Sequence, residues 1–458
     1  PIVFYIDPAF PKLWQEAIAD GIRDWNKAFE AIGFKGVMVT KSYADGGKDF
    51  DPDDMRFNCF RYVVSDFQNA MGKHWVDPRT GEVLQADVLF YSNVLPLLRK
   101  WYFLQTAAYN PVARQRTLPD SVLHRILRYA AAHEIGHCLG LEHNFRASAA
   151  YPTESLRKPA FAESQGTTAS IMDYARFNYV AQPGDGVKQV CPPLLGAYDY
   201  YTIKVGYAWK PQEDEQALRR EIDAAQANPA LRYGRMNPSE VPVDPSVQTS
   251  DLGDDPVASA TYGIRNLRTI VEHIASWNKG ADGNPFEGMP ATLDDLRDNY
   301  FEQLQRVVPL IGGIYRCEAS ERNGVGKETF VPAVQSERAV DFLLDELTNG
   351  YQFLASPAVQ AYAGSQTEAL VKQQRQLLVQ KMLSRVVLGH IARTQQATGF
   401  TLKAYLKRIS QRLESGGQSA GLYLLNLRQA YTERLQELSK DKSPAYYDVL
   451  LRLSMEDQ

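Results

Sequence analysis

The feature that most constrains this chain is the run from His133 to His143, which has the pattern H-E-x-x-H-x-x-G-x-x-H. On a helix, positions four apart lie one turn apart on the same face, so His133 and His137 can direct two imidazoles at one ion. Gly140 can adopt a positive φ angle, which ends the helix and brings His143 back as a third ligand. Three protein ligands leave the fourth position open, as in catalytic zinc sites. The pattern therefore predicts one catalytic Zn²⁺ ion.

Glu134 follows the first of these histidines directly, so its carboxylate points beside the metal and not at it. That placement suits a general base that holds a metal-bound water. The chain has only seven histidines, and three of them lie in this motif. The alternative, a helix with satisfied core histidines, does not require this spacing. We therefore expect Glu134 to be a catalytic residue.

The segment Ser170-Ile171-Met172-Asp173-Tyr174 follows downstream. Together with the histidine motif, it resembles the metzincin clan of zinc endopeptidases, in which a Met-turn lies beneath the metal. The resemblance implies that Met172 is that methionine. It also implies that Tyr174 binds zinc or stabilises the tetrahedral oxyanion. The alternatives are a methionine that fills the core and a packed aromatic ring.

The segments 170–179, 196–201 and 251–255 extend this resemblance. They are similar to a family of large bacterial zinc-dependent metalloproteases with a met-zincin domain and a helical C-terminal extension. Members usually carry a signal peptide and further upstream domains, which implies an exported protein that is periplasmic, outer-membrane-associated or extracellular. Asn144, after the third histidine, departs from the best-known metzincins. This departure leaves the subfamily and the substrate preference open.

Residues 1–207 mix strand-like and helix-like periodicity. Apolar residues recur at helical spacing between Trp14 and Phe29 and between Pro119 and Leu141. Four runs read as strands, namely Ile2–Ile6, Gly36–Lys41, Phe60–Asp66 and Val83–Tyr91. We therefore expect a metzincin-like catalytic domain with a twisted mixed sheet and an active-site helix.

Residues 208–458 are mostly helical in pattern, which makes the expected fold class α+β with a boundary near residue 208. A small hairpin is predicted within Gly312–Val331, around Asn323-Gly324. The predicted helices are Glu213–Gln226, Pro256–Trp277, Leu293–Leu310, Ser336–Leu347, Glu368–Thr394, Leu402–Leu413 and Leu422–Leu438.

The charge balance and hydropathy exclude several classes of protein. The 50 Lys and Arg against 54 Asp and Glu give a net charge of −4, so we expect no nucleic-acid partner. The segment Ser365–Glu414 contains nine basic and two acidic residues. We expect these basic residues to lie on solvated faces of helices, and we favour this interpretation over binding of an anionic partner. No apolar run is long enough for a transmembrane segment. The first residues, Pro-Ile-Val-Phe-Tyr-Ile-Asp, do not resemble a signal peptide.

Two weaker candidate sites remain. Five aspartates between residues 45 and 54 could bind calcium, although their spacing is not that of an EF-hand and a solvated acidic loop is favoured. They are Asp45, Asp49, Asp51, Asp53 and Asp54. The four cysteines form no CxxC pair, and both buried free thiols and one or two disulfides are compatible with their spacing. They are Cys59, Cys138, Cys191 and Cys317.

The motif predicts hydrolysis of a protein or peptide substrate, with Glu134 as the base that activates water. An extended peptide would bind along an exposed strand edge, for which Val83–Ser92 is the candidate. One alternative is a binding or surface protein with a vestigial zinc domain. Another is a zinc hydrolase that acts on other bonds. The sequence predicts neither the cleavage site nor the oligomeric state.

Overall fold

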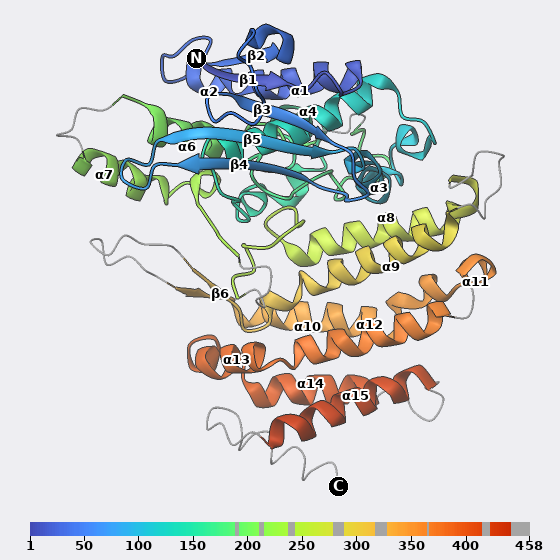
Figure 1. Ribbon diagram of the computed structural model, residues 1–458. Coiled ribbons are helices and arrows are strands. Elements are labelled where there is room, and N and C mark those ends of the chain that lie inside the picture. Colours follow the sequence, from blue (N-terminus) through green and yellow to red (C-terminus); the bar gives the residue numbers. More distant parts are fainter. Residues whose placement is uncertain are drawn as a thin grey trace. The chain divides into compact units, whose positions relative to one another are not determined.

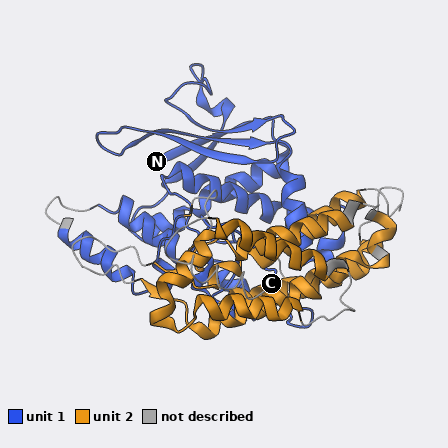
Figure 2. Cartoon of the chain, turned by 90° about the horizontal axis from the view of Figure 1, so that it is seen from below, with its two compact units in different colours: residues 1–235, 249–254 blue, residues 236–248, 255–458 orange. Residues whose placement is uncertain are grey.

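The computed structural model describes residues 1–187, 192–209, 215–236, 243–277, 288–316, 328–363, 366–414 and 422–440. Figure 2 colours two compact units, of which unit 1 comprises residues 1–235 and 249–254, and unit 2 comprises residues 236–248 and 255–458. Unit 1 contains a mixed sheet with helices, and unit 2 is mostly helical. These contents confirm the predicted α+β class. The domain boundary near residue 208 stays a prediction.

The sheet of unit 1 has five strands in the order β2-β1-β3-β5-β4 (Figure 1). Strands β1, β2, β3 and β5 run parallel, while β4 pairs antiparallel with β5 and forms one edge. Their bounds are β1 Ile2–Ile6, β2 Met38–Ser42, β3 Asn58–Val63, β4 Ala70–Val76 and β5 Val83–Tyr91.

The sequence placed the exposed strand edge wrongly. Strand β5, which covers most of the candidate Val83–Ser92, pairs with β3 on one side and with β4 on the other, so it lies inside the sheet. The edge strand on this side of the sheet is β4, which the sequence did not predict. It begins Ala70-Met71-Gly72-Lys73-His74, and this stretch lacks the alternating β-branched residues that mark a half-buried strand.

Two long helices, α1 (Lys12–Asp24) and α4 (Asp120–Cys138), pack against each other and against the strands of the sheet (Figure 1). They approach closely because α1 carries Gly21, where an added Cβ would lie 2.6 Å from the carbonyl oxygen of Arg128. The indole Nε1 of Trp25 donates to the carbonyl oxygen of Ala132 at 2.9 Å. This contact ties the end of α1 to the middle of α4, the helix that carries the histidine motif.

The remaining helices of unit 1 surround this core. Helix α3 was not predicted, although it begins with the apolar run Val94-Leu95-Pro96-Leu97-Leu98, in which the proline occupies the first turn where it is tolerated. The bounds of these remaining helices are α2 Asn26–Glu30, α3 Val94–Thr106, α5 Pro159–Gln165, α6 Ala197–Tyr207 and α7 Glu215–Ala225.

Unit 2 is an array of helices that pack on their neighbours, with α9 between α8 and α12, and α12 also against α15. The predicted helix Glu368–Thr394 is in fact two helices, because Ser384 interrupts it and its hydroxyl accepts from the backbone N–H of Val387 at 3.3 Å. The helices are α8 Pro256–Trp277, α9 Met289–Gln305, α10 Ala333–Thr348, α11 Pro357–Ala363, α12 Gln366–Met382, α13 Arg385–Thr398, α14 Leu402–Glu414 and α15 Leu422–Ser439.

Strands β6 (Ile314–Tyr315) and β7 (Thr329–Phe330) form the ends of the predicted hairpin in unit 2. The expected turn at Asn323-Gly324 lies outside the described residues. No helix in the described ranges has the length and apolar character needed to cross a bilayer.

The basic segment Ser365–Glu414 makes many of its contacts inside unit 2. Arg375 is fully buried, not solvated as predicted, and its Nε donates to the carbonyl oxygen of Leu347 at 3.0 Å. Arg408 forms an ion pair with Asp341 on α10 at 2.5 Å. These contacts give the basic residues structural partners within the helical array.

Candidate metal centre and active site

Three histidines of unit 1 converge on one point. His133 and His137 lie one turn apart on α4, and the chain turns at Gly140, whose φ is +86°, to bring back His143. The Nε2 atom of His143 lies 3.3 Å from Nε2 of His133 and 3.2 Å from Nε2 of His137. Nitrogen ligands at about 2.05 Å in a tetrahedron lie about 3.3 Å apart. The observed spacing is therefore that of ligands around one zinc ion.

Backbone carbonyls orient two of these imidazoles. The Nδ1 atom of His133 lies 2.6 Å from the carbonyl oxygen of Ile171, and Nδ1 of His137 lies 2.9 Å from that of Leu141. A carbonyl oxygen only accepts, so each Nδ1 carries the proton and each Nε2 keeps its lone pair for a metal.

The environment keeps the histidines neutral. Burial lowers the pKa of His133 well below its ordinary value, and the neighbouring histidines add to this effect. Burial also lowers the pKa of His137, and it lowers that of His143 to about 4. The Nε2 lone pairs of His133 and His137 face the Nε2 atom of His143, and a cation bound between the three would satisfy all of them. The donor set fits Zn²⁺, which favours imidazole nitrogen and a tetrahedral arrangement.

Glu134 lies beside the histidines, buried at 8% exposure. Its Oε2 accepts a hydrogen bond from the backbone N–H of Gly72 on the edge strand at 2.6 Å. Burial raises the pKa of Glu134 to about 7, and the Gly72 bond opposes this shift. A carboxyl group of this kind can exchange a proton near neutral pH.

Gly72 is a residue that the sequence analysis missed. A Cβ at this position would lie 2.2 Å from the backbone oxygen of Glu134 and 3.0 Å from Cβ of His137. Only a glycine lets β4 approach α4 closely enough for its N–H to reach the Glu134 carboxylate. Because β4 itself was not predicted, no signal in the sequence connected Gly72 with the motif.

Met172 is fully buried against the histidine-bearing helix. A Cβ added at Gly136 would lie 2.2 Å from the Sδ atom of Met172, so only a glycine leaves room for this side chain. The carbonyl oxygen of Met172 accepts from the backbone N–H of Asn144 at 3.1 Å. Met172 thus packs directly on the turn of α4 between the first two histidines.

Tyr174 also lies at the centre, half-buried. Its ring centroid is 4.5 Å from that of His143 and 5.7 Å from that of His133. Burial raises the pKa of its phenol, so the hydroxyl keeps its proton at neutral pH.

Two further polar residues hold the loops of the site. Asp199 on α6 is fully buried, and its carboxylate accepts from the backbone N–H of Ile171 at 2.7 Å and from the Ser170 hydroxyl at 2.6 Å. Asn144, also fully buried, donates to the carbonyl oxygen of Arg232 at 2.9 Å. The sequence analysis gave neither residue a structural role, because their partners lie far away in the chain.

A cavity of about 500 Å³ opens onto the three histidines, Glu134 and Tyr174. Helix α3 supplies its apolar wall with Val94, Leu97, Leu98 and Trp101, and the edge strand supplies another wall. The remaining lining residues are Asn69, Ala70, Met71, Gly72, Lys73, Tyr129, Ala130, His133, Glu134, His137, His143, Tyr174 and Arg176.

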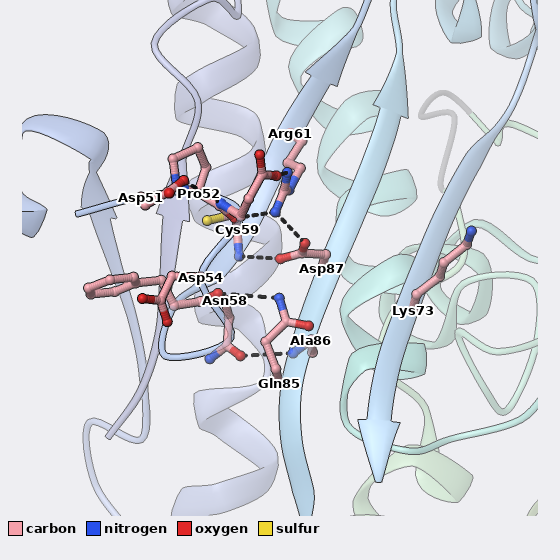
Figure 3. A network of polar contacts seen from close by, with 12 residues as sticks. Asp51, Pro52, Asp54, Asn58, Cys59, Arg61, Lys73, Gln85, Ala86 and Asp87 are labelled. Carbon is pink, nitrogen blue, oxygen red and sulfur yellow. Dashed lines mark hydrogen bonds and ion pairs between the residues drawn. The ribbon is translucent and has the colours of Figure 1, made fainter. Parts of the chain in front are cut away.

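The acidic loop does not gather its carboxylates around a cation position. Figure 3 shows Arg61 of β3 directed at Asp87 of β5, with an ion pair of 2.8 Å, and Arg61 also pairs with Asp53 at 2.6 Å. Asp54 pairs with Arg56 at 2.7 Å. Among the described residues, the three histidines are the only group of three or more His, Cys, Asp or Glu whose ligand atoms converge. The loop therefore gives calcium no support.

Neither described cysteine belongs to the converging group of histidines. Cys59 and Cys138 are buried free thiols, while Cys191 and Cys317 lie outside the described residues. His124, on the same helix as the motif, pairs with Asp20 at 3.2 Å.

In a comparison with protein families, the model of the Met-zincin family matches residues 115–419. No curated protein and no solved structure gives a significant match.

Proposed function

Because the chain belongs to the Met-zincin family, we propose that it is a zinc-dependent endopeptidase that hydrolyses peptide bonds in proteins or peptides. The observation that carries this proposal is the convergence of three neutral imidazoles beside a buried carboxylate. His133, His137 and His143 would hold the ion, and Glu134 would act as general base.

A zinc ion held by the three histidines would supply a Lewis acid that polarises the substrate carbonyl and makes water more acidic. Glu134 accepts a proton from the attacking water and passes it to the leaving amine nitrogen. The N–H of Gly72 holds the Glu134 carboxylate in place through its 2.6 Å bond. Tyr174, beside His143, donates its phenolic hydrogen toward the oxygen that gains negative charge.

The edge strand β4 offers a binding site for an extended substrate. Gly72 directs its N–H to Glu134, away from β5, and alternate residues of a strand direct their main-chain groups to the same side. Ala70 and His74 therefore present their N–H and C=O groups toward the open edge. A peptide that pairs with them would pass beside the histidines, which favours main-chain recognition of unfolded or loop segments.

Met172 and the export of the protein complete the proposal. Met172 would support the metal site from below through its contact with α4 at Gly136. Export to the periplasm, the outer membrane or the medium rests on the family resemblance alone.

The test uses the whole chain with zinc, incubated with casein and with a peptide library, with and without a chelator. We expect cleavage that the chelator abolishes, and we expect Glu134→Gln to retain zinc while losing cleavage. Glu30→Gln serves as the matched control, because Glu30 is exposed on α2. Peptidase activity that survives Glu134→Gln would refute the mechanism. Bound zinc without any cleavage would favour the alternative of a zinc-binding protein.

A further inference from the structure

Arg176 lines the active-site cavity but has no part in the chemistry above. Its guanidinium carbon lies 3.0 Å from the centroid of the Trp101 ring and 5.1 Å from that of Tyr174. The stack on Trp101 holds a positive charge against the wall that α3 forms. This charge lies close to the residue that we place beside the substrate carbonyl.

The backbone at Arg176 is unusual. Arg176 has a φ of +39° and Ser250 a φ of +59°, and within the described ranges they are the two non-glycine residues with positive φ. They also contact each other, since Nε of Arg176 donates to the Ser250 hydroxyl across 3.5 Å. Residues with a Cβ rarely adopt this conformation, and such departures concentrate at ligand sites. The fold thus maintains a disfavoured backbone where it places the arginine.

Cations outnumber acids among the described residues that line the cavity. Among the described residues that line it, Glu134 is the only acid, whereas Arg176 and Lys73 are both cations. The bound zinc would add further positive charge. A substrate carboxylate would therefore be attracted into this cavity, and a substrate ammonium group would be repelled.

The geometry also suits a carboxylate. A guanidinium that covers an aromatic ring with its face binds carboxylates through its edge, so the Trp101 stack and a salt bridge are compatible. Leu97 and Leu98 lie along the same cavity and can pack against the methylene groups of an acidic side chain.

We propose that Arg176 is a specificity-determining residue that selects substrates with Asp or Glu next to the cleaved bond. This inference rests on the proposed peptidase function. It names a substrate class for the site, namely acidic peptides, and assigns the choice to one side chain.

The experiment compares peptides that differ only by Glu or Gln, or by Asp or Asn, at each position flanking a cleavage site mapped by mass spectrometry. For the zinc-loaded chain we expect about a 10- to 100-fold higher kcat/KM for the acidic member of a pair. Arg176→Gln should remove this preference and Arg176→Lys should retain part of it. Arg79→Gln is the matched control, because Arg79 is exposed and pairs with Asp77 outside the cavity.

A second measurement separates this inference from the proposed function. The same peptide pairs are titrated against Glu134→Gln, alone and combined with Arg176→Gln, and binding is followed by fluorescence anisotropy. Tighter binding of the acidic peptide that depends on Arg176 supports the inference even if no peptide is cleaved. Equal affinities within each pair, or a preference that survives Arg176→Gln, overturn it even if cleavage is efficient.

Discussion

Replacing Gly72 with alanine tests whether the close approach of the edge strand to α4 matters for catalysis. The new Cβ would lie 2.2 Å from the backbone oxygen of Glu134, so β4 must retreat by about 1.2 Å to reach an ordinary contact. Because the Cβ of a strand residue points out of the sheet while its N–H lies in the plane of the sheet, this retreat lengthens the Gly72 N to Glu134 Oε2 distance from 2.6 Å to at most about 3.8 Å, which weakens or breaks the hydrogen bond.

The expected effect follows from the weakening or loss of this hydrogen bond. A hydrogen bond to a charged group contributes about 1.5–3 kcal/mol. Because this bond holds the proposed general base, we expect its complete loss to lower kcat/KM about 10- to 150-fold. The overpacking should also lower the free energy of unfolding by about 1–3 kcal/mol. Zinc should remain bound, since the alanine removes no ligand.

The assay measures kcat/KM on a cleaved peptide, zinc content by metal analysis, and unfolding in urea. Gly206→Ala is the control, because Gly206 lies in α6 and an added Cβ would meet nothing within 4 Å. That control should keep full activity and unfold at the same or higher urea concentration. A zinc-loaded Gly72→Ala protein with unchanged kcat/KM would show that the Gly72 contact does not position Glu134.

Three further predictions concern the support of the site. Burial raises the pKa of Asp199 to about 7, above its unfolded value, so its stabilising contribution is full below about pH 4 and is lost as the pH rises through 7. Asp199→Asn should flatten this decline in the free energy of unfolding. Urea titrations from pH 4 to 8 that give parallel curves for both proteins would contradict this prediction. Gly136→Ala should displace Met172, whose Sδ lies 2.2 Å from the new Cβ, and cost about 1–3 kcal/mol in urea unfolding, whereas Gly389→Ala should cost nothing because its Cβ meets open space. A chelator should lower Tm because it removes a metal ion that binds only the folded state, and this shift should disappear in His143→Ala. An equal Tm with and without chelator would exclude a tightly bound metal.

The local part of the site was predictable from the sequence. The helix, its two histidines and the turn at Gly140 all follow from spacing within eleven residues, and the structure has them as expected. Gly72 and Asp199 were not assigned a role, because each acts through a contact with a residue more than 25 positions away. Spacing carries no information on contacts of that kind.

The same division applies to the fold. The strands β1, β2, β3 and β5 have strong apolar runs and were predicted near their positions. The edge strand β4 has no fully buried side chains, so its sequence shows no alternation of apolar and polar residues, and it was not predicted. Arg375 was misplaced on a wet face because a helical spacing does not reveal that Leu347 supplies a buried carbonyl for its guanidinium.

An edge strand that stays open for a substrate is equally open to another copy of the same protein. Strand β4 limits this risk with the exposed charge of Lys73 and with a shift of register between Trp75 and Val76. The regular part of the edge is therefore only Ala70–Trp75, which limits the main-chain groups available for pairing with a second molecule. Under the proposed function, the strand would combine access for a substrate with features that limit pairing between folded molecules.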